Sequence, residues 1–331
     1  MDKKAFAVFL IVSSLAIAAI AFYVLAGVGS MSAPVRNFIL PRRLMEILAI
    51  FLVSVSVAYS SVIFQTITNN RILTPAVIGF ESVYMFVQTV IVFASPQIFI
   101  LGGQIQGAYF ITAKPNFILS IVVMMLFSLL LYNLMFKKGE GRNIYFLLLV
   151  GMILGTMFTS LTTFMQMLID PSEFLIVQGR ILASFNAINQ ALVLISVAAV
   201  GLTVLYSLPI AKYLDVMLLG RETAISLGVN HSALSKRFLF IIAVLVSVST
   251  ALVGPVTFLG VLVTNLTYQL IKSHKHVYII PTCVAVTTVA LVGGQFLVSR
   301  VFNFSTTLSI IINFVGGIYF IYLLLRENKS W

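Results

Sequence analysis

The sequence predicts an all-α protein that crosses a membrane about ten times. Of its 331 residues, 60% are hydrophobic and only 9% are charged, and the mean hydropathy is +1.11. About a quarter of the residues of a soluble domain are charged, so this composition excludes an ordinary soluble fold. The apolar residues are also gathered in runs of about 20, the length that spans a hydrocarbon core about 30 Å thick.

Ten apolar segments are predicted to be crossings. They are approximately residues 5–28, 44–68, 76–94, 117–136, 144–169, 187–208, 234–253, 256–271, 277–298 and 307–325. The first has about 24 apolar residues, more than the roughly 7 to 15 of a signal-peptide core, so we interpret it as an uncleaved helix. Gly254 and Pro255 separate the seventh segment from the short eighth. These two segments form either two full crossings or a broken, re-entrant element.

Lysine and arginine are concentrated on one side of this arrangement. With the N-terminus inside, 14 of the 20 fall in cytoplasmic connections and 6 in outer ones. Positive residues are retained on the cytoplasmic side of a membrane, so we expect both termini to be cytoplasmic and the number of crossings to be even. The net charge of +11 is then explained by the membrane, with no nucleic acid as a partner.

The connections between the segments are short. The longest cover about residues 29–43, 95–116 and 209–233, and stretches of this length bury too little apolar surface to fold alone. Residues 1–331 are therefore predicted to form a single transmembrane domain. Any soluble enzymatic activity is expected to belong to another chain.

Residue types that carry chemistry are scarce. No Gly-rich string followed by Lys and Ser or Thr is present, so this chain is not expected to bind or hydrolyse ATP. The acids at or within the predicted helices are Glu46, Glu81 and Glu222, and we place Glu81 at the cytoplasmic start of its helix, where water solvates it. His274 and His276 are interpreted as part of a solvated turn. A path for bare metal ions would need His or carboxylate ligands, so no metal site and no cofactor are expected on this chain.

Four strings stand out at the ends of the predicted helices. They are LPR (residues 40–42), LTPAVIGF (73–80, preceded by Gln65 and Asn70), LLGRETAISLGVN (218–230) and GPVTFLG (254–260). In this order they resemble the permease family of ATP-binding-cassette importers for ferric siderophores, haem and cobalamin. The resemblance extends over nearly the whole chain, and it implies ten helices per subunit.

The resemblance implies that residues 209–233 form the loop that couples the permease to its ATPase subunits. A short helix, a turn at Gly220 and a second short helix ending at Gly228 would present apolar and charged side chains on one exposed knob. The expected coupling residues are Leu219, Gly220, Arg221, Glu222 and Gly228.

The resemblance also implies a docking surface for an extracytoplasmic substrate-binding protein or lipoprotein. Arg42 and Arg300 fall on family positions whose arginines meet acidic residues of that protein, and we place both just outside a helix. A further family arginine is replaced here by Ile39, so Arg43 or Arg36 is expected to supply that charge. The alternative is that these arginines anchor the helices at the lipid interface.

Small polar residues recur on one face of the fifth predicted helix. They are Thr156, Thr159, Ser160, Thr163 and Gln166. Ser309 and Asn313 repeat the pattern in the tenth helix. Such side chains either line a path or bond to their own backbone and neighbouring helices, and the resemblance, which implies a pathway between these helices of two facing subunits, favours the path. Asn70 and Ile72 match positions where the family narrows the cytoplasmic end.

We interpret the chain as the permease subunit of an importer for a ferric siderophore in the cytoplasmic membrane of a bacterium. It would form a homodimer or heterodimer with a second permease, in contact with lipid, while separate subunits use ATP. Haem and cobalamin remain open as substrates. The alternative from another class is a proton-coupled secondary transporter working alone, which would need an intramembrane carboxylate.

Overall fold

The computed structural model describes residues 3–26, 32–102, 113–136, 144–186 and 188–327. These residues form thirteen α-helices and one 3-10 helix, and they contain no strand. Ten of the helices coincide with the predicted crossings, so the all-α membrane fold is confirmed. Seven are long and apolar enough to span a membrane, and two more have shorter apolar stretches.

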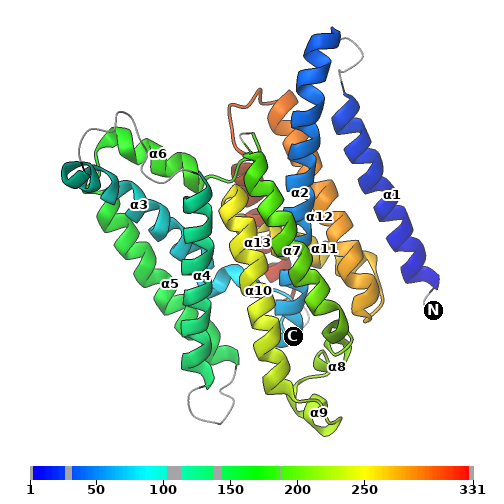
Figure 1. Cartoon of the computed structure of the whole chain (residues 1–331). Coiled ribbons are helices and arrows are strands. Elements are labelled where there is room, and N and C mark those ends of the chain that lie inside the picture. Colours follow the sequence, from blue (N-terminus) through cyan, green and yellow to red (C-terminus); the bar gives the residue numbers. More distant parts are fainter. Residues whose placement is uncertain (1–2, 27–31, 103–112, 137–143, 187, 328–331) are drawn as a thin grey trace.

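The ten helices run side by side as a bundle (Figure 1). They are α1 (Lys3–Leu25), α2 (Ala33–Thr68), α3 (Phe80–Gly102), α4 (Ala113–Phe136), α5 (Ile144–Gln166), α7 (Gln190–Ala211), α10 (His231–Val253), α11 (Leu259–Leu270), α12 (His276–Arg300) and α13 (Leu308–Glu327). The shorter elements are η1 (Pro75–Ile78), α6 (Pro171–Ile181), α8 (Leu214–Met217) and α9 (Arg221–Ser226).

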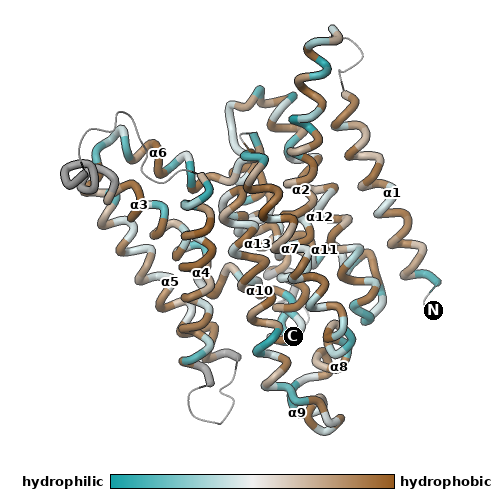
Figure 2. The backbone as a smooth tube through the Cα atoms, viewed as in Figure 1, coloured by the Kyte–Doolittle hydropathy of each residue, from teal (hydrophilic) through white to brown (hydrophobic). Residues whose placement is uncertain are grey.

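The bundle has two distinct ends. Helix α9 lies at one, which we call the α9 end, and α6 and the start of α2 lie at the other, the α6 end (Figure 1). Helix α1 begins toward the α9 end and α13 ends toward it, as an even number of crossings requires. Figure 2 shows apolar residues along the length of the bundle and hydrophilic residues gathered toward both ends, including α9.

Helix α2 begins earlier than the sequence predicts. It starts at Ala33 rather than near residue 44, with Pro34 in its first turn, and it continues through Pro41. The prediction that Arg42 lies outside a helix is therefore wrong. Proline suits the first turn of a helix, and an internal proline removes one backbone donor without always ending the helix. The start of α2 extends beyond the body of the bundle (Figure 1), where charged side chains do not oppose helix formation.

Two backbone breaks interrupt the bundle away from its ends. Gly79, with φ 95°, separates η1 from α3, so the segment predicted as one helix over 76–94 is broken. Gly254, with φ 98°, ends α10, and residues 254–258 are not helical before α11 begins. Helix α11 has 12 residues, a rise of about 18 Å, so residues 254–271 combine a non-helical stretch with a short helix, and the choice between two full crossings and a re-entrant element stays a prediction.

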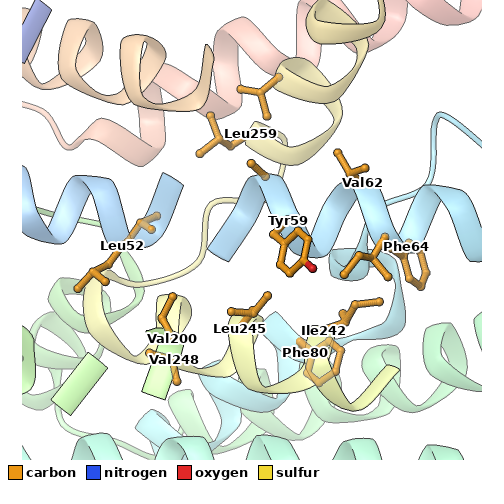
Figure 3. Packing of buried hydrophobic residues seen from close by; sticks show 14 of the residues in the cluster. Leu52, Tyr59, Val62, Phe64, Phe80, Val200, Ile242, Leu245, Val248 and Leu259 are labelled. Atoms are coloured by element: carbon orange, nitrogen blue, oxygen red, sulfur yellow. The ribbon is translucent and has the colours of Figure 1, made fainter. Parts of the chain in front are cut away.

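Helix α2 is the centre of the packing. It lies against α7, α10 and α12, and its small buried residues allow these helices to approach closely. Those residues are Ala49, Ser54, Ser56, Ala58, Ser60 and Ser61. The Tyr59 hydroxyl donates a 2.6 Å hydrogen bond to Ser207 of α7. Figure 3 shows Tyr59 and Phe64 beside Ile242 and Leu245 of α10.

Candidate functional site

A cavity of about 840 Å³ opens at the α9 end. The end of α2, the α8 segment, the end of α11 and the start of α12 line it. Asn70, predicted at the cytoplasmic gate, and Leu219, predicted in the coupling loop, both face this cavity. Ile72 is half-buried beside it and donates its backbone N–H to Asn70 Oδ1 at 2.9 Å. The structure thus brings the predicted gate and the predicted coupling loop onto one cavity.

The coupling loop has the two-helix form that the sequence predicts. Gly220 (φ 95°) connects α8 to α9, and Gly228 (φ 80°) follows α9. This backbone region is favourable only for glycine. Ala224 is buried and fixes α9 to the bundle, whereas the residues around it are exposed. The exposed residues are Leu219, Arg221, Glu222, Thr223, Ile225, Ser226, Leu227 and Gly228. Apolar and charged groups therefore share one protruding surface, which we call the knob.

A buried histidine connects the knob to the transmembrane helices. His276, the first residue of α12, donates its backbone N–H to Asp215 Oδ1 of α8 at 2.9 Å, and its Nδ1 lies 2.6 Å from the same oxygen. Its Nε2 lies 2.7 Å from Thr66 Oγ1 of α2. The interpretation of His276 as part of a solvated turn is wrong, because only 3% of it is exposed. The partners are 61 and 210 residues away in the sequence, so no local pattern could reveal them.

The imidazole of His276 links three helices. The Thr66 hydroxyl lies within hydrogen-bond distance of both His276 Nε2 and the carbonyl oxygen of Val62, at 2.7 and 2.8 Å. On its other side the imidazole Nδ1 faces the Asp215 carboxylate. The network therefore joins α8 to α12 and α12 to α2.

We expect His276→Ala to destabilise the permease by about 1.5 to 3 kcal/mol, because it leaves a partly buried carboxylate and a buried hydroxyl without their partner. The matched control is His274→Ala, since His274 is exposed in the same connection. Thermal unfolding of the detergent-purified variants measures both. Equal melting temperatures for His276→Ala and the wild type would show that the link carries no stability.

A second cavity, of about 500 Å³, opens at the α6 end. The three arginines predicted to dock a binding protein all line it, together with Ile39 and Glu46. Arg42 is exposed, with its guanidinium carbon 6.0 Å from the centre of the Phe38 ring. Arg43 is half-buried and Arg300 is exposed. This end of the molecule therefore presents a concave, positively charged surface.

Two of these arginines also cap a helix. Arg43 Nη1 donates to the carbonyl oxygens of Val24 and Ala26, each at 2.8 Å, and Arg300 Nη2 donates to Ala26 at 2.9 Å. The last carbonyls of a helix have no partner within the helix, so the two guanidinium groups satisfy the end of α1. Arg43 thus has a structural role that the sequence did not indicate, and Arg42 is the arginine most open to a partner.

The polar series on α5 lies on the surface of the single chain. Thr156, Thr159, Ser160 and Thr163 are exposed, and each hydroxyl donates to the backbone carbonyl four residues earlier. Gln166 is half-buried and donates to Thr89 of α3 at 3.3 Å. The hydroxyl hydrogens need no further acceptor, so these residues leave a weakly polar surface of methyl groups and acceptor oxygens.

The exposed surface of α5 divides into two halves between residues 155 and 165. The half beside α3 carries the four hydroxyl residues, and Thr159 also contacts Ser82 of α3 at 3.0 Å. The other half is apolar and carries Met157, Leu161 and Phe164. A helix that faced lipid all round would not need this division. It suits a helix with one half toward lipid and one toward a partner or a path.

The corresponding residues of α13 are placed further inside. Only 3% of Ser309 is exposed, and its hydroxyl lies 3.1 Å from that of Thr307. Asn313 is half-buried, and its Oδ1 has no hydrogen-bond partner. Gly316 lies against Phe258, whose Cβ is 2.6 Å from where a Cβ on Gly316 would be. The assignment of Ser309 and Asn313 to a path stays a prediction.

Among the described residues, no cluster of three His, Cys, Asp or Glu side chains could hold a metal ion.

The fold and the site define a multi-pass membrane permease, a transport subunit and not an enzyme. The chain belongs to the FecCD transport family, whose model matches residues 5–326. It is 53% identical over 297 residues to the petrobactin import system permease protein YclO of Bacillus subtilis (strain 168), covering 89% of this chain and 91% of that protein. It is 36% identical over 290 residues to the petrobactin import system permease protein FatC of Bacillus anthracis, covering 88% and 79%.

A solved structure has the same fold. It is a metal-chelate type ABC transporter in an inward-facing conformation, with a TM-score of 0.80 over 96% of this chain and 99% of that one. The sequence identity is 20%, so the likeness concerns the fold alone. Membership of this family implies an ATPase and a substrate-binding protein as partners.

Proposed function

We propose that this chain is the permease subunit through which a ferric siderophore of the petrobactin type crosses the cytoplasmic membrane of a bacterium. The observation that carries the proposal is the 53% identity to a petrobactin import permease over 91% of that protein. Haem and cobalamin become less favoured substrates. The chelator ligates the iron during passage, so the path needs no metal ligands of its own.

In this proposal the two ends of the molecule meet different partners. The α9 end is cytoplasmic, both termini are cytoplasmic, and the knob docks on ATPase subunits that bind and hydrolyse the ATP. The α6 end faces outward, and its arginine-lined cavity meets the binding protein. The hydroxyl half of α5 lies on the path between this chain and a second permease, identical or different, and its apolar half faces lipid. No cofactor is bound by this chain.

Reconstitution of the importer tests the proposal. The permease is incorporated into proteoliposomes with its ATPase, the binding protein and each candidate permease partner, and uptake of radioactive iron as ferric petrobactin, of haem and of cobalamin is measured. We expect ATP-dependent uptake and ligand-stimulated ATP hydrolysis with the ferric siderophore. Uptake that needs only a proton gradient and no ATPase would support a secondary transporter and contradict the proposal.

The exposed arginines give a second test. We expect Arg42→Glu combined with Arg300→Glu to weaken docking of the binding protein and to make it more sensitive to salt, because exposed ion pairs are worth about 1 kcal/mol or less and desolvated ones about 2 or more. Surface plasmon resonance at several ionic strengths measures this. The control is Lys114→Glu, which reverses an exposed charge that does not line the cavity and should leave docking unchanged. If the arginines serve only as anchors, the double variant will dock normally and lose thermal stability.

A further inference from the structure

The two backbone breaks meet each other inside the bundle. Thr257, in the stretch that interrupts α10 and α11, donates its hydroxyl to Glu81 Oε2 at 2.7 Å. Glu81 belongs to the first turn of α3, directly after the break at Gly79. Irregular backbone at membrane depth is tolerated only where protein buries it or where it lines a cavity. The point where the two breaks meet is therefore a candidate ligand site.

Glu81 lies near the middle of the membrane. A Cβ on Gly79 would be 2.9 Å from the Cα of Gly155, and Gly155 is the central residue of α5. The start of α3 therefore lies beside the centre of a membrane-spanning helix. The expectation that Glu81 sits at the solvated cytoplasmic start of its helix is wrong. The depth at which α3 begins differs from the expectation because α2 is followed by a loop and η1, which return the chain toward the middle of the bundle before α3 begins.

A small polar crevice surrounds this carboxylate. Its volume is about 40 Å³, enough for one water molecule or one small ion. Its other polar lining consists of hydroxyls, from Ser60, Ser61, Thr74, Ser249, Thr250 and Thr257. Glu81 itself is half-buried as a whole residue. The adjacent Ser82 contacts Thr159, which places the crevice next to the hydroxyl half of α5.

The charge of Glu81 is not balanced within the described part of the chain. The ion pair found there joins His276 to Asp215, and no Lys, Arg or His of the described residues lies within ion-pair distance of Glu81. An ionisable side chain at membrane depth is costly to retain and usually serves a ligand or an ion path. Hydroxyl and carboxylate oxygens accept hydrogen bonds from ammonium groups and coordinate hard cations, and the one carboxylate of Glu81 balances one positive charge.

We propose that the Glu81 crevice is a binding site for a singly charged cationic group. The occupant is a primary ammonium group of the transported ligand or a free alkali-metal ion, and its place on the transport path rests on the proposed function. Glu81 supplies the charge, and the surrounding hydroxyls replace the water that the cation loses. A purely structural role, in which Glu81 only ties the two breaks together through Thr257, would not attract cations.

Charge-selective labelling tests the site without a binding protein or ATP. Ser249 lines the crevice, and its hydroxyl donates to its own helix, to the Val246 carbonyl oxygen at 3.1 Å. Ser249→Cys is made with the buried Cys283 changed to Ala, and the protein in lipid nanodiscs is labelled with 2-aminoethyl or neutral 2-hydroxyethyl methanethiosulfonate. Relative to a free thiol, we expect the cationic reagent to be favoured roughly tenfold or more. Glu81→Gln should abolish this preference, Glu81→Asp should keep part of it, and the control Asp170→Asn, at an exposed carboxylate, should not change it.

Competition identifies the source of the cation. Sodium chloride, potassium chloride, ethylammonium chloride and choline chloride are compared at equal ionic strength for their ability to slow the cationic reagent. Protection by sodium or potassium indicates a free ion, and protection by ethylammonium alone indicates an amine of the ligand. The proposal is overturned if the preference is absent, if it survives Glu81→Gln, if none of the salts protects better than choline, or if the cysteine reacts with neither reagent.

Where Glu81→Gln does not fold, as judged by size-exclusion chromatography, Glu81→Asp and the competition series in the unchanged carboxylate background still decide the question. The outcome is also separate from that of the proposed function. A permease that labels selectively but imports no ferric siderophore would contradict the function and leave the site standing. Normal ferric siderophore import with no charge preference in labelling would support the proposed function and contradict the cation site.

Discussion

Insertion of two residues after Gly220 is expected to abolish uptake while the permease still folds and inserts. The insertion lengthens the non-helical turn between α8 and α9, so the exposed residues of the knob no longer face the ATPase as they did. Ala224 would also leave its buried position. The ten crossing helices are unaffected because the loop lies outside the hydrocarbon. Uptake, ATPase co-purification and melting temperature are measured on the same preparations.

A point substitution separates the loss of a surface contact with the ATPase from a change in the position of α9. Glu222→Lys keeps the backbone and reverses one exposed charge, and we expect it to loosen the ATPase and to lower uptake. Thr223→Ala is the matched control, since Thr223 is an exposed neighbour in the same helix. Normal uptake by a well-expressed, correctly inserted Gly220 insertion would show that the knob does not transmit the ATP-driven motion.

The route of that motion into the membrane suggests why the effect should be large. The knob continues into α8, where Asp215 binds His276 of α12, and His276 in turn meets Thr66 of α2. One residue before Thr66, Gln65 Nε2 donates to the Arg71 carbonyl oxygen at 2.7 Å and to Thr264 Oγ1 at 2.9 Å. A displacement of α8 therefore acts directly on the end of α2 that precedes the predicted gate.

The sequence predicts those features that repeat locally along the chain. Apolar runs locate the ten main helices of the bundle, and the two glycines at 220 and 228 predict the form of the knob because each needs a backbone conformation that other residues rarely adopt. The polar face of α5 follows from helical spacing. In each case the physical signal lies within about one or two turns of the residues that it concerns.

Features that depend on tertiary contact were missed. The depth of Glu81 is set by the approach of Gly79 to Gly155, which no periodicity encodes. His276 follows two lysines and a histidine in a polar stretch, yet α8 and α2 bury it. Helix α6 was not predicted either, although Asp170 and Pro171 at its start and Arg180 in its last turn are favourable end residues.

The hydroxyl half of α5 is expected to be hydrated and its apolar half to face lipid. Single cysteines at Thr156 and Thr163, with Cys283 replaced, should react with a water-soluble thiol reagent in at least one state of the transport cycle, because thiolates form readily only in water. Cysteines at Leu161 and Leu168 should stay inert. The comparison with Leu161 is well matched, since Thr156, Thr163 and Leu161 are all exposed on α5 in the single chain and differ in which half they occupy. Leu168 is exposed in the turn that follows α5.

Thr163→Trp is expected to block uptake and to leave docking of the binding protein unchanged, because the indole would stand in the path and away from the arginine-lined cavity. Leu161→Trp places the same bulk on the apolar half, where lipid accommodates it, and should transport. The hydroxyls already bond to their own backbone, so the loss on Thr163→Trp would come from obstruction and not from a broken hydrogen-bond network. If the hydroxyl-half cysteines are inert in both resting and ATP-trapped states, and Thr163→Trp transports normally, these residues are packing groups and the path lies elsewhere.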